Sequence, residues 1–383
     1  MVLPRVQVKE LRRTYGFEEV AIVPGDVTTN PDLSVPNFEI GPYQFTIPIM
    51  ASAMDAIVSP AYAGLMAKAG GIGVMNLEGV YGRYEDPQAA IDEVSAAPRE
   101  NVTEVLQRVY TAPLKDNLVA DRVSDIRETG AVVAVSVTPQ NAKRLAPLAV
   151  EAGAQIIVVQ STVTTARHMS NSYTGLRFAD LVSMIDVPVL VGNTVTYSAT
   201  LELMETGIGG IFVGVGPGAA CTTRDVTGMG VPQVSATIDC AAARDEFYAS
   251  TGKYVSIITD GGIRTGGDLC KAIASGADAV MIGTPFAQTH EAPGRGFNWG
   301  MASPHPALPR GTRINVGATA SLETVLFGPS HRTDGTQNLV GALKVSMSMV
   351  GAQSITEFHE KAELVVAPTI ATEGKIYQRA GQI

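Results

Sequence analysis

Short, uniformly apolar runs alternate with amphipathic stretches along most of the chain. The apolar runs predict eight strands, at Phe45–Ser52, Ile72–Met75, Ala131–Val137, Ile156–Val159, Val189–Val191, Gly210–Val215, Tyr254–Thr259 and Ala279–Ile282. The amphipathic stretches predict helices at Pro60–Ala69, Pro87–Ala96, Leu114–Thr129, Pro139–Glu151, Leu176–Ile185, Tyr197–Glu205, Pro232–Ser250, Gly266–Ser275, Leu343–Ala352 and Thr356–Glu363. Uniformly apolar strands are typical of a parallel sheet whose two faces are both covered.

Eight strand–helix units in roughly 250 residues predict a (β/α)₈ (TIM) barrel. A doubly wound open sheet is the alternative, but the strand count and the lack of G-x-G-x-x-G after the first strand favour the barrel. We expect one barrel domain over residues 1–383, with an irregular N-terminal arm over residues 1–45. Residues 288–341 are too long for an ordinary connection and predict a lid over the barrel mouth; a surface excursion or a subunit contact is the alternative.

The composition of the chain limits the classes of binding partner and the cellular compartment that we expect. The net charge is −9 and the basic residues are scattered, which argues against nucleic acid or an anionic membrane but allows a phosphorylated small molecule. The three cysteines, Cys221, Cys240 and Cys270, show no disulfide or zinc spacing, which is typical of a reducing compartment. No signal peptide and no apolar stretch of ~18 residues is seen, so we expect a cytoplasmic protein.

The candidate chemistry lies after the predicted strands, because barrel enzymes react at the carboxyl ends of their strands. The stretch Gly214–Gln233 surrounds Cys221 with glycine and proline, which specify a backbone shape, and a thiol held there is a candidate nucleophile. A cysteine that serves as small filler is the alternative. The loops that follow the last two strands predict a phosphate site at Gly261, Gly262 and Gly283, with Asp260 accepting a ribose hydroxyl.

These motifs resemble the IMP dehydrogenase/GMP reductase family. The resemblance runs from about Phe45 to Ala352 and rests on S-A-M-D at Ser52–Asp55, G-G-I-G at Gly70–Gly73, G-N at Gly192-Asn193, G-V-G-P-G-A-A-C-T-T-R at Gly214–Arg224, G-V-P-Q at Gly230–Gln233, D-G-G-I-R at Asp260–Arg264, E-A-P-G at Glu291–Gly294, G-M-A-S at Gly300–Ser303 and S-M-S-M-V-G-A at Ser346–Ala352. It implies a cytoplasmic homotetrameric barrel enzyme that acts on purine nucleotide monophosphates (GMP, IMP or XMP).

The resemblance also implies residue roles. Cys221 would attack purine C2 and form a thioimidate, and hydride would move between C2 and NAD(H) or NADP(H). Nucleotide contacts would come from Ser52, Met54, Gly218, Ala219, Asp260, Gly262, Gly283, Thr284, Gly300 and Met301. Gln160, Ser161, Thr162 and Asn193 would lie beside the cofactor. In the dehydrogenases, potassium binds to loop carbonyls that correspond to Gly216, Gly218 and Cys221.

Several positions depart from the family pattern. Ala219 replaces a phosphate-binding serine, Phe212 a basic residue and Gln160 an acidic residue beside the cofactor. The interval between Met75 and Ala131 is too short for the regulatory (CBS) domain of many dehydrogenases, so the chain resembles a subfamily without that domain.

The residues available to move protons indicate the direction of the reaction. Dehydrogenases use an Arg-Tyr pair in the lid as a base for water, and here the only such pair, Arg83-Tyr84, lies elsewhere. Reductases use a threonine two residues after the cysteine, here Thr223, with a lid glutamate; its usual position is Pro304, so Glu323 is the candidate acid. We therefore expect GMP reduction with NADPH. The alternatives are IMP oxidation with NAD and a catalytically silent nucleotide-binding regulator.

Overall fold

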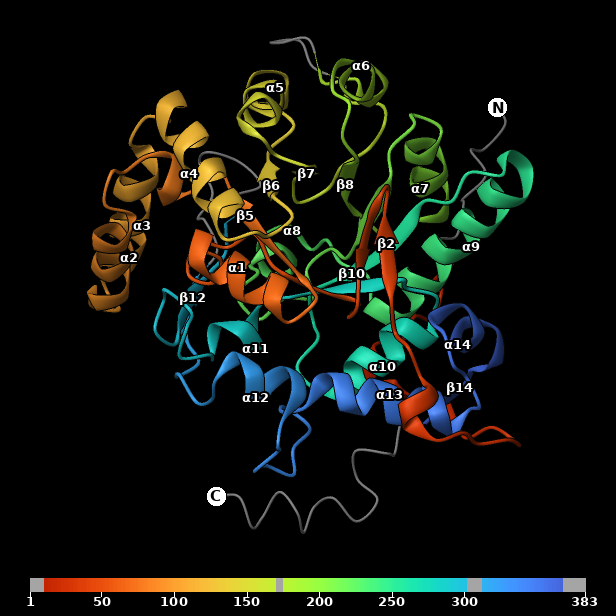
Figure 1. Cartoon of the computed structure of the whole chain (residues 1–383). Helices are drawn as coiled ribbons and strands as arrows, with labels where there is room; N and C mark the ends of the chain where they lie inside the picture. Colours follow the sequence, from red (N-terminus) through yellow and green to blue (C-terminus); the bar gives the residue numbers. More distant parts are fainter. Residues whose placement is uncertain (1–9, 170–174, 302–311, 368–383) are drawn as a thin grey trace, which may run out of the picture.

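A computed structural model of the chain describes residues 10–169, 175–301 and 312–367. Eight parallel strands close into a barrel in the order β10-β11-β4-β5-β6-β7-β8-β9, with the helices arranged around it (Figure 1). The barrel strands are β4 (Ile49–Ala51), β5 (Ile72–Asn76), β6 (Ala134–Val137), β7 (Ile156–Gln160), β8 (Val189–Thr194), β9 (Gly210–Val213), β10 (Ser256–Asp260) and β11 (Ala279–Ile282). The predicted (β/α)₈ barrel is confirmed, and each of its eight strands falls on a predicted apolar run.

The predicted helices are present with shifted ends, and the structure adds four that were not predicted. The helices are α1 (Pro60–Lys68), α2 (Pro87–Ala96), α3 (Val102–Thr111), α4 (Asp116–Glu128), α5 (Ala142–Ala152), α6 (Phe178–Met184), α7 (Tyr197–Met204), α8 (Thr223–Thr227), α9 (Gln233–Thr251), α10 (Gly266–Ala274), α11 (Thr284–Ala287), α12 (Leu322–Phe327), α13 (Leu339–Met349) and α14 (Ile355–Lys361). The helices that were not predicted are α3, α8, α11 and α12. No helix within the described ranges is long and apolar enough to cross a bilayer.

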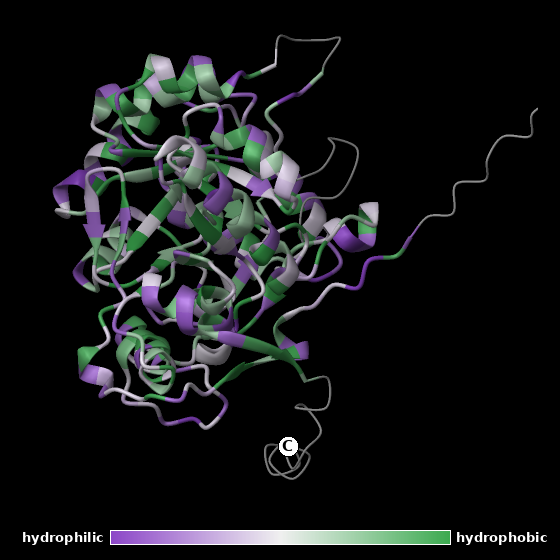
Figure 2. Cartoon of the chain, turned by 90° about the vertical axis from the view of Figure 1, so that its right-hand side faces the viewer, coloured by the Kyte–Doolittle hydropathy of each residue, from purple (hydrophilic) through white to green (hydrophobic). Residues whose placement is uncertain are grey.

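The core lies inside the barrel and between its strands and helices. Ile49, Val135, Ile157 and Ile258 are fully buried, each from a different strand. Figure 2 shows hydrophobic segments concentrated in the interior and hydrophilic ones on the outer helices. Burial on both faces explains why the strands read as apolar runs without alternation.

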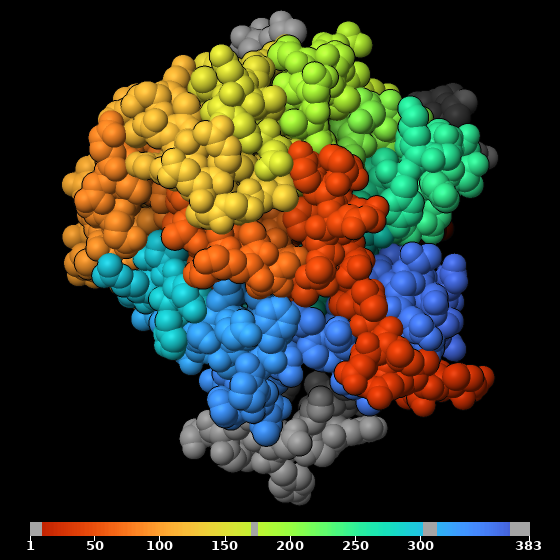
Figure 3. Space-filling model, viewed as in Figure 1, coloured from red at the N-terminus to blue at the C-terminus, as the bar shows by residue number. Residues whose placement is uncertain are grey.

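The N-terminal arm is more regular than predicted, and the expectation of an irregular segment was wrong for its described part. β1 (Val20–Val23) pairs antiparallel with β14 (Glu363–Val366), and β2 (Phe38–Ile40) forms a hairpin with β3 (Tyr43–Phe45). The Ser256 hydroxyl at the start of β10 donates to Glu39 O in that hairpin at 3.2 Å. The hairpin therefore packs at the amino-terminal end of the barrel, where Figure 3 shows the arm as a red band across the surface.

The predicted lid also contains regular elements. β12 (Phe297–Trp299) pairs antiparallel with β13 (Arg313–Asn315), and α12 and the first residues of α13 follow. Residues 302–311, which include Pro304, lie outside the described ranges. The region predicted to be a lid thus contains a β-hairpin that starts soon after the last barrel strand, and we call residues 288–341 the flap from here on.

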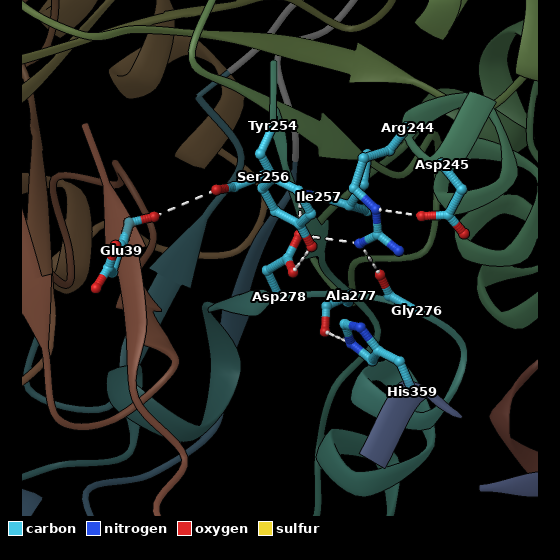
Figure 4. Close-up of polar contacts among 10 residues, drawn as sticks. All are labelled: Glu39, Arg244, Asp245, Tyr254, Ser256, Ile257, Gly276, Ala277, Asp278 and His359. Atoms are coloured by element: carbon cyan, nitrogen blue, oxygen red, sulfur yellow. Dashed lines mark hydrogen bonds and ion pairs between the residues drawn. The ribbon is translucent and has the colours of Figure 1, made fainter. Parts of the chain in front are cut away.

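A partly buried polar cluster joins helices to the amino-terminal end of the barrel (Figure 4). Arg244 of α9 donates to the carboxylate of Asp278 at 3.2 Å, and the Tyr254 hydroxyl donates to the same carboxylate at 2.5 Å. Nε2 of His359 in α14 lies 2.9 Å from Ala277 O. Burial lowers the pKa of His359, so its neutral ring donates to that carbonyl. Because Asp278 precedes β11, this cluster supports the barrel at the end opposite the candidate site.

Candidate active site

Asp260, Asn193 and Gln160 form a hydrogen-bonded cluster at the carboxyl end of the barrel. Asn193 Nδ2 donates to Asp260 Oδ2 at 2.8 Å, and Gln160 Nε2 donates to the same oxygen at 3.2 Å. Gln160 Nε2 also lies 3.0 Å from Asn193 Oδ1. Burial raises the pKa of Asp260 to about 6, although the two amide hydrogen bonds act in the opposite direction. Asp260 thus has one oxygen held by amides and the other, Oδ1, not engaged by them.

The loop after β7 runs beside the end of β8. Ser161 N donates to Gly192 O at 2.9 Å, and Asn193 N donates to Ser161 O at 3.1 Å. The Ser161 and Thr164 hydroxyls are 2.9 Å apart, and Thr164 is buried while Thr162 is partly exposed. Gln160, Ser161, Thr162 and Asn193 are therefore brought to one edge of the mouth, next to Asp260, as a cofactor site would require.

Cys221 is exposed in the loop after β9, whereas Cys240 and Cys270 are buried. Its Sγ donates to Thr223 Oγ1 at 3.2 Å, and its backbone N–H donates to Gly218 O at 3.1 Å. Burial raises the pKa of both Cys240 and Cys270 to about 12, so these thiols stay protonated and unreactive. The exposure of Cys221 argues against its role as small filler.

Arg224 fixes the shape of the cysteine loop. Its side chain packs so closely on Gly216 and Gly230 that an added Cβ would come within 2.6 Å and 2.5 Å of it, and its Nη2 donates to Val231 O at 3.2 Å. Gly216 also has φ +78°, which disfavours any other residue. Within the described ranges, no group of three or more His, Cys, Asp or Glu side chains could hold a metal ion. The carbonyls of Gly216, Gly218 and Cys221 remain as oxygen donors of the kind that the resemblance assigns to potassium.

The cysteine loop lies against the predicted phosphate loop. A Cβ added to Gly262, which has φ +79°, would lie 3.2 Å from the Cβ of Pro217, and one added to Gly261 would lie 3.5 Å from Gly218 N. On the neighbouring strand, a Cβ on Gly283 would lie 3.5 Å from Met54 Sδ.

These distances place the backbone of Gly218, Gly262 and Gly283 in adjoining loops. Ser52 and Met54 face Gly283, Thr284 begins α11 and Ala219 is exposed beside Gly218. The arrangement brings the predicted phosphate residues and the cysteine loop to the same end of the barrel, so one nucleotide can span them.

The flap supplies Gly300 and Met301 directly after β12. Both are partly exposed, and Met301 Sδ lies 3.5 Å from the hydroxyl oxygen of Tyr110. Glu323, the candidate acid, is exposed in the first turn of α12, a helix that contacts α11 and α13. In the described part of the chain, no hydrogen bond joins Glu323 to Cys221 or Thr223, so its role stays a prediction.

Two residues near the site were missed by our sequence reasoning. Gln233 Nε2 donates to Val213 O at 2.7 Å and to Asp260 O at 2.8 Å, which joins the ends of β9 and β10. Its position in G-V-P-Q was the available signal. Tyr110 lies in α3, which we did not predict, although its apolar positions at Val102, Leu106 and Val109 follow helical spacing.

Comparison with known proteins agrees with this fold. The model of the IMP dehydrogenase/GMP reductase domain matches residues 14–303. An uncharacterised oxidoreductase of Mycolicibacterium smegmatis is 42% identical over 91% of this chain and 96% of its own. An inosine-5'-monophosphate dehydrogenase of Cryptosporidium parvum is 29% identical over 94% of both chains. The crystal structure of an IMP dehydrogenase/GMP reductase-like protein from Corynebacterium glutamicum superposes with a TM-score of 0.89 at 37% identity, over 94% of this chain and 97% of the other.

The fold and the site define a (β/α)₈-barrel oxidoreductase. The chain belongs to the IMP dehydrogenase/GMP reductase family. Between β5 and β6 the structure contains α2, α3 and α4 and no regulatory domain, as in a subfamily that lacks the CBS domain.

Proposed function

We propose that this oxidoreductase reduces GMP to IMP and ammonia through a covalent bond between Cys221 and purine C2. The observation that carries the proposal is the exposed residue Cys221, whose Sγ lies 3.2 Å from Thr223 Oγ1. The sulfur adds to C2, the bond from C2 to the exocyclic nitrogen breaks, and that nitrogen leaves as ammonia after gaining a proton. NADPH, when bound, supplies the hydride that C2 receives, and the C–S bond then breaks to regenerate the thiol.

Thr223 is suited to the proton steps. Its side chain is buried and accepts a hydrogen bond from the thiol. A hydroxyl can accept a proton on one lone pair while it donates its own, so it can take the thiol proton and deliver one to the departing nitrogen. Glu323 has no comparable support from the described contacts, and its proposed role as the acid rests on the family resemblance alone.

The remaining roles follow the geometry of the mouth. We assign the ribose to Asp260, whose Oδ1 is not held by the neighbouring amides, and the phosphate to the backbone of Gly262, Gly283 and Thr284. The nucleotide would further contact Ser52, Met54, Gly218, Ala219, Gly300 and Met301. The amides and hydroxyls of Gln160, Ser161, Thr162 and Asn193 suit the polar edge of a nicotinamide cofactor. Potassium at the loop carbonyls, cytoplasmic location and homotetrameric assembly stay predictions from the family.

IMP oxidation to XMP with NAD is the alternative, favoured by the likeness to the Cryptosporidium parvum dehydrogenase over 94% of both chains. That reaction needs a base that activates water. The Arg83-Tyr84 pair is engaged elsewhere, because the Tyr84 hydroxyl donates to Val109 O at 2.9 Å and Arg83 donates to Ala112 O. A silent nucleotide-binding regulator is the second alternative, to which the departures at Ala219, Phe212 and Pro304 give some weight.

A two-way turnover assay tests the direction. The purified chain is mixed with GMP and NADPH, and separately with IMP and NAD, while the absorbance of the reduced nicotinamide is followed. We expect consumption of NADPH in the first mixture and no change in the second. NADH production in the second mixture alone would reverse the proposed direction. Binding of GMP and IMP without turnover in either mixture would favour the silent regulator.

A further inference from the structure

The flap contacts the segment between β5 and α4. Arg313 Nη1 of β13 lies 2.7, 2.8 and 2.7 Å from the carbonyl oxygens of Val94, Ser95 and Ala97 at the end of α2. A cation is favoured there because the last carbonyls of a helix are unpaired and carry partial negative charge. Figure 1 shows β12 near α2 and α3. The α2–α3 segment (Pro87–Thr111) is therefore the support on which the flap hairpin rests.

The phenol oxygen of Tyr110 joins the α2–α3 segment to two other elements near the candidate site, the loop after β4 and the flap. The Tyr110 hydroxyl of α3 donates to Asp55 Oδ2 at 2.7 Å and accepts a hydrogen bond from Trp299 Nε1 at 2.7 Å. Asp55 and Trp299 are fully buried, and Tyr110 is nearly so. Asp55 directly follows Met54, and Trp299 lies two residues before Met301. Tyr110 thus touches the loop after β4 and the flap at the same point.

Breaking these buried hydrogen bonds would cost free energy. A buried carboxylate and a buried indole N–H each need a hydrogen-bond partner. Loss of the Tyr110 hydroxyl takes this acceptor from Trp299 Nε1, whereas Asp55 Oδ2 still accepts from Val80 N at 2.7 Å. Met301 Sδ also lies 3.5 Å from the same hydroxyl oxygen. Because Asp55, Trp299 and Tyr110 are packed with little or no exposure, a shift at Tyr110 would also displace their neighbours in sequence, Met54 and Met301.

We infer that Tyr110 is a positioning residue that holds Met54 and Met301 on the purine base, and that the α2–α3 segment sets the position of the flap through it. The inference rests on the proposed function, which places Met54 and Met301 against the nucleotide. Tyr110 itself does not touch the reacting atoms. Its removal should therefore act on nucleotide affinity more than on the chemical step.

The chain offers a direct probe, because Trp299 is its only tryptophan. In Tyr110→Phe we expect Trp299 fluorescence to shift, since the indole N–H loses its acceptor. We expect the Kd for GMP and IMP, measured by calorimetry, and the KM for the nucleotide to rise about tenfold, as follows from the loss of one buried hydrogen bond. The kcat should change by less than a factor of about three.

The matched control is Tyr84→Phe, which removes a phenol from the same region. The Tyr84 hydroxyl donates to Val109 O and has no part in the Asp55–Trp299 contact. We expect wild-type emission, Kd and KM from it. Trp299→Phe removes the indole donor from the other side of the contact, and it should raise Kd and KM as Tyr110→Phe does, which keeps the test valid if one variant fails to fold.

An unchanged Kd and an unshifted Trp299 emission in Tyr110→Phe would overturn the inference, as would equal effects from Tyr84→Phe. The proposed function fails by a different result, namely absence of GMP and IMP binding to the wild-type chain.

Discussion

Replacing Cys221 by alanine is expected to abolish turnover while nucleotide binding persists. The sulfur is exposed at the mouth and forms the covalent bond in the proposed route, so its loss should lower kcat on the order of 10⁴-fold or more. The phosphate and ribose contacts are proposed to come from other loops, so the Kd for GMP should change little. Steady-state kinetics measures the first effect, and calorimetry with GMP measures the second.

The control for this variant is Cys270→Ala. Cys270 lies buried in α10, and burial raises the pKa of its thiol to about 12. Its replacement should cost some stability and leave kcat near the wild-type value. Alkylation should label Cys221 in the wild-type chain and be slowed by bound GMP. Turnover that survives in Cys221→Ala would eliminate the covalent route altogether.

The barrel could be predicted because its signal is local. Each strand is an apolar run, and each run is separated from the next by a helical stretch, so the order of elements follows from the sequence alone. α3 carried such a signal too, but Val102, Val109 and Tyr110 have only modest helix propensity and we left the stretch unassigned. Helix ends shifted by a few residues because the terminal turns of helices fray.

The arm and the flap could not be predicted in the same way. β1 is stabilised by β14 at the far end of the described chain, and no local pattern near Val20 indicates a partner at Val366. β12 and β13 pair with each other although other residues separate them in the sequence, and no turn motif between them indicated a hairpin. Short strands of this kind form because tertiary pairing overrides weak local propensity.

The candidate site likewise contains residues that the sequence could predict and contacts that it could not. Cys221, Asp260 and Gly262 could be assigned because their loops carry motifs after predicted strands. The contact of Gln160 with Asp260 depends on side-chain conformations and on closure of the barrel, and the family resemblance implied only that Gln160 lies near the cofactor. The Tyr110–Trp299 hydrogen bond joins two elements whose proximity no motif indicated.

Asp260 is expected to produce two opposite pH effects. Burial raises the pKa of Asp260 to about 6 from an ordinary value near 3.8, so the folded protein binds more protons than the unfolded chain between these values. The free energy of unfolding of the ligand-free protein should therefore contain a term that is fully favourable below pH ~4 and is lost as the pH rises through ~6. That term amounts to at most about 3 kcal/mol.

Nucleotide affinity should change with pH in the opposite direction to stability. The proposed ribose hydroxyl donates to the carboxylate, and protonation below pH ~6 weakens that acceptor, so the Kd should fall as the pH rises through this range. In Asp260→Asn, the amide oxygen can still accept from Asn193 and Gln160 while its NH₂ faces the ribose. We expect this variant to bind GMP roughly 10- to 100-fold more weakly at neutral pH.

Comparing wild type with Asp260→Asn isolates both effects from the other acidic groups of the chain. Chemical denaturation from pH ~4 to ~7 should show a difference in unfolding free energy that changes across pH ~6 in favour of the variant, because asparagine carries no charge to desolvate. Calorimetry over the same range should show a difference in GMP affinity between wild type and variant that changes across pH ~6. The second ionisation of the GMP phosphate also lies near pH ~6, but it contributes to both proteins and cancels in that difference. A difference that stays constant with pH in both measurements would exclude titration of Asp260 in this range.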